Sequence, residues 1–225
     1  MLMMQTQKFL LKGLATASKN KQLPETLEFM KLSQSEIPKY SGSLEDIDGI
    51  SNLFAQRASF LSIKAGNALK KEENSEQAFL DLQPFELKDM CEAYHDTYNI
   101  ESFKTFLQTF KDAKTKNVFS NLLLLHIHVR MMNHGSFFFK VLGEGEMDNL
   151  KNRINEELKT LRGEIVRLTS ILPFPNRMMG ALGNEDMQVY ERFIQHFKAA
   201  PKVTERPEWW KLSYTNSEQK ISKTH

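Results

Sequence analysis

The feature that most constrains the fold is a stripe of apolar residues between positions 147 and 172. Its members recur at alternating intervals of three and four residues, the heptad repeat of a helix with one narrow apolar face; they are Met147, Ile154, Leu158, Leu161, Ile165, Leu168 and Leu172. Burial of each such side chain contributes about 1.5–3 kcal/mol, so a marginally stable protein cannot leave the stripe in water. The pattern predicts a long helix packed against a partner. Other helices of suitable length favour an internal bundle over an intermolecular coiled coil.

The remaining apolar patterns predict further helices and no strands. Apolar residues repeat at helical spacing in residues 54–68, 87–98, 103–110, 118–142 and 187–197. No segment alternates apolar and polar residues between hairpin turns over the length of a strand. We therefore predict an all-α protein, an irregular multi-helix bundle with one long heptad-patterned helix and a mobile C-terminal tail.

Proline, glycine and polar residues predict the domain boundaries. Residues 33–48 contain Pro38 and Gly42 and show little periodicity, and Pro201 ends the last helical pattern. We expect an N-terminal basic helix and loop in residues 1–47, a helical bundle domain in residues 48–200, and a flexible tryptophan-containing tail in residues 201–225.

The charge distribution limits the classes of partner. Lysine and arginine together number 30 and aspartate and glutamate 28, so the overall balance does not call for a nucleic acid. The apolar segment at residues 118–142 is interrupted by His126, His128 and Arg130, which argues against a transmembrane span. Residues 1–24 carry four lysines and no acidic residue, and the helix expected there either docks on the bundle or makes peripheral contact with a membrane.

The single cysteine indicates a reducing compartment. Cys91 has no second cysteine with which to form an internal disulfide. Leu87, Met90 and Tyr94 place it on the apolar face of a helix, where we expect a small buried side chain instead of a reactive thiol. The expected location is therefore cytoplasmic, with association to a membrane-bound complex left open.

Two groups of residues are candidates for metal or haem binding. Glu92 and His95 have the Glu-x-x-His spacing that brings both to one helix face, although the second copy needed for a di-iron bundle is absent. We expect them on the surface, with Asp96 on the same exposed side. His126 and His128 point apart, because residues two positions apart differ by about 200° around a helix. With His134, they are expected to be core histidines satisfied by hydrogen bonds, and no cofactor is predicted.

The C-terminal region supplies the candidate partner-binding residues. Trp209 and Trp210, together with Leu212 and Tyr214, put large apolar side chains on an otherwise polar segment. Tryptophan is enriched among the residues that dominate interface energies, so these four residues are expected either to bind a protein partner or to fold back onto the bundle.

No short catalytic motif is present, and this decides the function expected from sequence. The chain lacks the nucleophile elbow, the phosphate-binding loops and the common zinc patterns. We expect a non-catalytic helical adaptor, an accessory subunit of a larger assembly. In size and helicity, though through no specific residues, it is similar to small accessory subunits of bacterial secretion or coupling complexes. The alternative is a helical metal- or haem-binding enzyme that uses Glu92, His95 and His126 or another histidine of residues 126–134.

Overall fold

The structure is entirely helical in the residues that it describes. This computed structural model describes residues 2–32, 36, 39–71, 75–171, 178 and 188–210. Every regular element among them is a helix, which confirms the predicted all-α class. The chain divides into two compact units, residues 1–163 and residues 164–225, here called unit 1 and unit 2.

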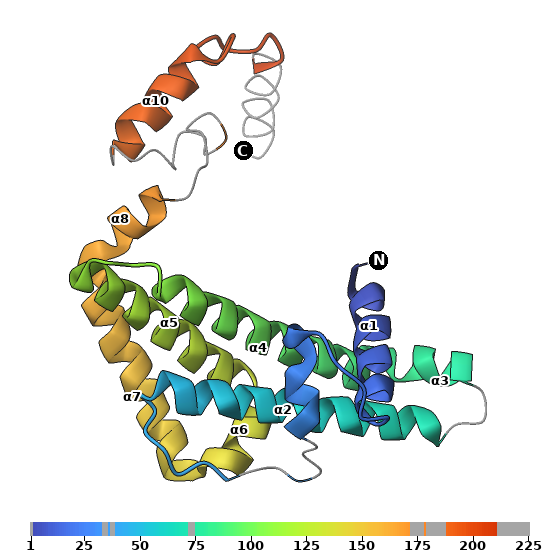
Figure 1. Cartoon of the computed structure of the whole chain (residues 1–225). Helices are drawn as coiled ribbons and strands as arrows, with labels where there is room; N and C mark the ends of the chain where they lie inside the picture. The colour runs from blue at the N-terminus through green and yellow to red at the C-terminus, as the bar shows by residue number, and fades with distance from the viewer. Residues whose placement is uncertain are drawn as a thin grey trace, which may run out of the picture. The chain divides into compact units, whose positions relative to one another are not determined.

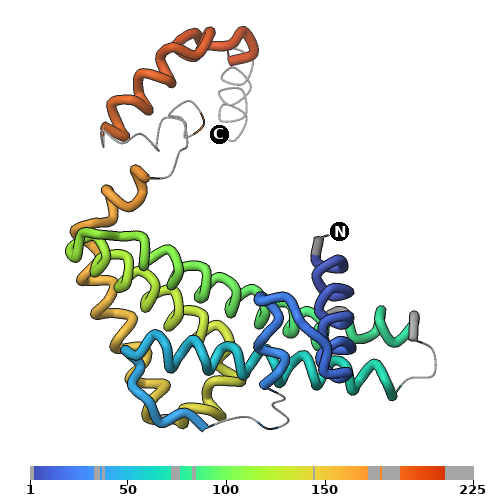
Figure 2. Tube along the Cα trace, in the orientation of Figure 1, coloured from blue at the N-terminus to red at the C-terminus, as the bar shows by residue number. Residues whose placement is uncertain are grey.

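Unit 1 holds most of the helices. In chain order they are α1 (Leu2–Ala17), η1 (Glu25–Leu32), α2 (Ile47–Lys70), α3 (Ser75–Asp81), η2 (Gln83–Leu87), α4 (Lys88–Leu107), α5 (Ala113–Asn133), α6 (Gly135–Leu142) and α7 (Glu144–Leu161). Helices α2, α4 and α5 lie side by side, with α6 and α7 toward one end and α1 toward the other (Figure 1). The tube in Figure 2 follows the chain from α1 through η1 into α2.

Local sequence explains where the long helices begin. The Asp46 side chain accepts a hydrogen bond from the backbone N–H of Asp48 at the start of α2, and Asp112 accepts one from Thr115 at the start of α5. Both are N-caps that satisfy amide groups left free by the first turn. Gly143 has a φ of 84°, which favours glycine, and it makes the turn from α6 into α7.

The core of unit 1 consists of two apolar clusters joined by α2 and α4. One cluster packs the first half of α2 and the second half of α4 against α5, α6 and α7, with Phe54 and Phe138 at its centre. The other packs the second half of α2 and the first half of α4 against α1 and η1. Helices α2 and α4 are therefore antiparallel neighbours that contribute to both clusters. Cys91 is buried in the second cluster, as expected, and burial raises the pKa of its thiol to about 11.

The heptad stripe is divided between two helices. Helix α7 ends at Leu161, a 3-10 segment follows at Arg162–Glu164, and α8 covers Ile165–Ser170 in unit 2. Gly163 lies in the interruption, where a residue without a side chain weakens a continuous helix. Helix α7 packs on α5 of the same chain and buries Leu161, so the partner of this part of the stripe is internal.

Unit 2 is described through α8 and α10 (Val189–Ala199). The helix predicted at residues 187–197 corresponds to α10, whereas Leu172, Met187 and residues 211–225 of the predicted mobile tail lie outside the described residues. Among the described helices of both units, none is long and apolar enough to cross a membrane. The proposed division at residues 47 and 200 concerns independent folding and stays a prediction.

Candidate functional site

A buried ion cluster joins three helices of unit 1. Asp96 of α4 is 2% exposed and accepts hydrogen bonds from Arg57 Nη1 of α2 at 3.0 Å and from Arg130 Nε of α5 at 2.6 Å. His134 Nε2, at the end of α5, lies 3.1 Å from the same carboxylate. The expectation that Asp96 lies on an exposed face is therefore wrong, because the two arginines and His134 cover that face.

The surroundings of Asp96 favour its charged form. Burial alone would raise the pKa of the carboxyl group, but hydrogen bonds from His134 and Arg130 and the charges of both arginines outweigh burial and lower it. Arg57 is itself buried, which lowers the pKa of its guanidinium, and Asp96 opposes that shift. The guanidinium also lies 5.9 Å from the ring centroids of Phe137 and Phe138 of α6. The cluster therefore ties α2, α4, α5 and α6 together.

A second polar contact joins α5 to α7. The His128 ring is fully buried; its Nε2 lies 2.8 Å from the carbonyl oxygen of Leu44, and its Nδ1 lies 2.7 Å from Glu157 Oε1. His128 is therefore a core histidine with polar neighbours, as expected, whereas His126 is exposed, so the expectation of a core position is wrong for His126. The arrangement fixes α7 against the segment that precedes α2.

The candidate metal ligands do not form a site in the described residues. Glu92 lies 3.7 Å from Lys88 Nζ and 4.0 Å from His134 Nε2, and His95 is an exposed residue beside Tyr94. His126 is exposed at the rim of a hollow between α4 and α5, and partial loss of solvent lowers the pKa of its imidazole. Within the described part of the chain, no group of three or more histidine, cysteine, aspartate or glutamate side chains is placed to hold a metal ion.

The tryptophans of unit 2 present apolar area to solvent. Trp209 is 61% exposed and Trp210 is 39% exposed, with the Arg206 guanidinium 5.1 Å from the Trp210 ring centroid. Leu212 and Tyr214, the other two candidate partner-binding residues, lie outside the described residues. Partner binding by these residues stays a prediction.

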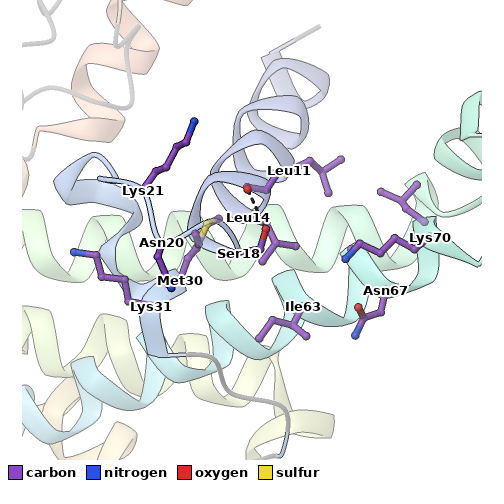
Figure 3. A pocket seen from close by; sticks show the side chains of 14 residues that line it. Leu11, Leu14, Ser18, Asn20, Lys21, Met30, Lys31, Ile63, Asn67 and Lys70 are labelled. Atoms are coloured by element: carbon purple, nitrogen blue, oxygen red, sulfur yellow. Dashed lines mark hydrogen bonds between the residues drawn. The ribbon is translucent and has the colours of Figure 1, made fainter.

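A pocket of about 580 Å³ lies where α1, η1 and α2 meet, here called the N-terminal pocket. Its apolar lining comes from all three elements, with Leu11 and Leu14 on α1, Met30 on η1 and Ile63 and Leu69 on α2. The pocket falls within the range of roughly 300–1,000 Å³ typical of small-molecule sites. Figure 3 shows Lys70 reaching back toward Ser18, whereas Lys21 and Lys31 point outward on the opposite side.

Sequence patterns could not locate this pocket, because it joins residues from three separated segments. The available signal was the basic N-terminal segment, of whose four lysines one, Lys21, lines the pocket. The Asp96 cluster was missed for a similar reason, since Arg57 lies 39 positions away in the sequence.

The chain has relatives among the acyl-CoA oxidases. A model of the acyl-CoA oxidase family matches residues 46–216. The acyl-coenzyme A oxidase acox-1.2 of Caenorhabditis elegans is 20% identical over 205 residues, which is 89% of this chain and 30% of that protein. The acox-1.3 protein of the same organism is 22% identical over 103 residues, 45% of this chain and 16% of its own length. The chain thus spans about a third or less of the length of these relatives.

Solved structures share the fold over nearly the whole chain. Acyl-CoA oxidase-2 of Caenorhabditis elegans, bound with FAD, ascaroside-CoA and ATP, superposes with a TM-score of 0.81 at 18% identity, covering 99% of this chain and 34% of that one. Acyl-CoA oxidase-1 of the same organism, complexed with FAD and ATP, gives a TM-score of 0.82 at 20% identity, covering 98% and 34%. Acyl-CoA oxidase1 of Yarrowia lipolytica gives a TM-score of 0.78 at 16% identity, covering 91% of this chain and 31% of that one.

These matches overturn the function expected from sequence. The non-catalytic adaptor, likened to accessory subunits of secretion or coupling complexes, is wrong, because the family model for an enzyme covers residues 46–216. The alternative, a helical metal- or haem-binding enzyme, is also wrong, because the family model that matches is that of the acyl-CoA oxidases. The error came from treating the lack of a short motif as evidence for an adaptor. The relatives are only about 20% identical to this chain.

Proposed function

Because the chain belongs to the acyl-CoA oxidase family, we propose that it takes part in the oxidation of acyl-CoA as the helical region of such an enzyme. The observation that carries the proposal is the family match over residues 46–216. That range begins at the N-cap of α2 and includes every residue of the Asp96 cluster. The acyl-CoA oxidases that share the fold support the same proposal.

Within this function, we assign the Asp96 cluster a positioning role. It fixes α2, α4 and α5 relative to one another through one carboxylate and three cationic or imidazole partners. Breaking such a buried ion cluster by removing one member is strongly destabilising, so the helices keep a single arrangement. A rigid helical layer of this kind can hold neighbouring parts of an enzyme in place without contacting the substrate.

The hollows described here do not fit FAD, the group bound by the nematode oxidases. FAD joins a planar aromatic ring system to a diphosphate, so its site needs flat apolar contacts together with cations or N–H donors. The hollow between α4 and α5 is lined by Phe103 and Phe106 but by no lysine or arginine. The N-terminal pocket has lysines and no aromatic residue, and the hollow beside α7 has one cation, Arg153, which pairs with Glu45 at 2.6 Å. We therefore assign FAD to residues other than those that line these three hollows.

The expected location and partners follow as proposals. The single buried thiol supports a reducing compartment such as the cytoplasm. The exposed Trp209 and Trp210 support contact with another polypeptide surface, which in an oxidase includes the remainder of the enzyme.

The proposal is tested by isolating the protein from its own cells under native conditions and measuring bound flavin by absorbance and by native mass spectrometry. We expect FAD in stoichiometric amount in the assembly that contains this chain. An assembly that contains the chain and no flavin in any preparation would contradict the proposed function.

A further inference from the structure

Two close contacts between elements lie next to the N-terminal pocket. At Gly66 of α2, an added Cβ atom would lie 2.4 Å from Leu14 Cδ2, so α1 and α2 touch there through a residue without a side chain. A similar close approach joins α1 to η1, where a Cβ on Gly13 would lie 2.6 Å from Leu27 Cδ1. The pocket opens beside these contacts, toward the ends of α1 and α2.

The apolar residues that line the pocket include no aromatic ring, and the polar side chains of Ser18, Asn20, Asn67 and three lysines line the rest of it. Leu11, Leu14, Met30, Ile63 and Leu69 provide flexible aliphatic side chains on three sides. Such a lining complements a linear alkyl chain better than a planar ring, because aliphatic side chains can close around methylene groups.

The rim carries positive charge only. The charged residues that line the pocket are Lys21, Lys31 and Lys70. Glu28 neutralises Lys31 at 2.7 Å, while Lys21 and Lys70 make no ion pair with any residue that the structure describes. Figure 3 shows the Lys70 side chain directed toward Ser18, while Asn20 lies on the other side of the view, beside Met30.

The carbonyl groups at the end of α1 are hydrogen-bonded within the turn that follows it. A helix C-terminus carries partial negative charge on its last carbonyl groups. At the end of α1, however, the carbonyl oxygens of Leu14, Thr16 and Ala17 accept hydrogen bonds from the N–H groups of Ser18, Lys19 and Asn20. These carbonyls are engaged in the turn, and Lys70 remains the charged group directed over the pocket.

We propose that the N-terminal pocket binds the anion of a long-chain fatty acid. The alkyl chain lies among the aliphatic side chains of α1, η1 and α2, and the carboxylate meets the Lys70 ammonium group. A free carboxylate is a compact anion that one ammonium group can pair with, whereas the Ser18 hydroxyl already donates a hydrogen bond to the carbonyl oxygen of Ala15 at 3.0 Å. The site goes beyond the proposed oxidation and does not rest on it.

Titration calorimetry of the full chain with octanoate, dodecanoate and hexadecanoate tests the alkyl site. Burial of one methylene group improves affinity about fourfold, so we expect binding to strengthen with chain length until the pocket is full. Ala17→Trp should fill the pocket and abolish binding. Thr16→Trp, on the same turn but outside the lining, should leave binding unchanged.

The role of Lys70 is tested with a charge-reversal variant and with a ligand that has the same alkyl chain and an uncharged head group. Lys70→Glu should weaken the binding of hexadecanoate by about tenfold or more, because it removes a charge-assisted hydrogen bond. Lys64→Glu, an exposed lysine of the same helix outside the lining, is the matched control and should change affinity less than twofold. Hexadecanol should bind more weakly than hexadecanoate and be insensitive to Lys70→Glu.

Three results would overturn the proposal. One is the absence of hexadecanoate binding by the folded wild-type chain, and another is equal binding by the wild type and Ala17→Trp. The third is binding of hexadecanoyl-CoA without binding of hexadecanoate, which would mean that the site takes the thioester and not the free acid. Loss of this site would leave the flavin measurement unchanged, so the two proposals fail separately.

Discussion

Unit 1 has a buried apolar core, whereas no residue of α10 in unit 2 is buried. The short helix α6 in unit 1 buries Phe138 and Val141. The longer helix α10 has no buried residue, and Phe193 is 52% exposed. Both helices are amphipathic in sequence. An amphipathic pattern therefore identifies the apolar face of a helix. Whether another element packs on that face depends on tertiary contacts.

The sharpest test of this comparison removes one phenylalanine from each unit. Phe54→Ala should lower the free energy of unfolding by about 3–5 kcal/mol, since Phe54 is fully buried and packs on Phe138. Phe193→Ala should change it by less than about 0.5 kcal/mol. Urea unfolding followed by circular dichroism measures both. Equal effects would mean that α10 is covered as fully as α2.

Asp96 provides the next largest effect. Asp96→Ala leaves Arg57 buried without its carboxylate and should destabilise unit 1 by about 3 kcal/mol, the lower part of the range for broken buried ion pairs. The lower value is expected because Arg130 is partly exposed and can be solvated. Asp148→Ala removes an exposed ion pair with Lys151 and is the control, with an expected change within about 0.5 kcal/mol. If Asp96→Ala left the free energy of unfolding unchanged, the cluster would not hold the helices together.

The stability contributed by Asp96 should depend on pH in a defined direction. Its pKa is lower in the folded chain than the ordinary value of about 3.9, so the unfolded chain binds the proton more readily. The contribution is present in full above that ordinary value and is lost as the pH falls through the lower pKa of the folded state. In urea unfolding at a series of pH values, the difference between wild type and Asp96→Asn should shrink as the pH falls below about 4. A difference that grows in acid would have the wrong sign.

The smallest effect on stability is expected for the tryptophans. Replacing Trp209 and Trp210 together by alanine should change the melting temperature of the chain only slightly, because neither side chain is buried: Trp209 is 61% exposed and Trp210 is 39% exposed. The same double variant should lose capture of its partner in a pull-down from source cells. A large drop in melting temperature would mean that the tryptophans pack on their own chain.

Helical periodicity was sufficient to predict the fold class and several elements. The pattern around Phe54 and Ala58 predicted α2, and the first part of the stripe from Met147 to Leu172 lies on α7, which packs on α5 of the same chain. The rest of the stripe prediction is wrong: the helix is interrupted after Leu161, and Leu158 and Ile165 are 51% and 52% exposed.

Contacts between distant segments lay beyond that reasoning. Asp96 shares a helix face with Glu92, and only the approach of Arg57 and Arg130 from two other helices makes it a buried residue. The N-terminal pocket depends on the contact of Gly66 with Leu14, which no local pattern announces. The family was missed because its relatives are only about 20% identical to this chain.

The most direct test of the central claim is acyl-CoA-dependent oxygen consumption in a native extract before and after depletion of this protein. Membership in the acyl-CoA oxidase family predicts that depletion removes part of the activity, and that adding back the native assembly that contains the chain restores it. Oxygen consumption that is unchanged by complete depletion, with every acyl-CoA tested, would contradict a role in acyl-CoA oxidation.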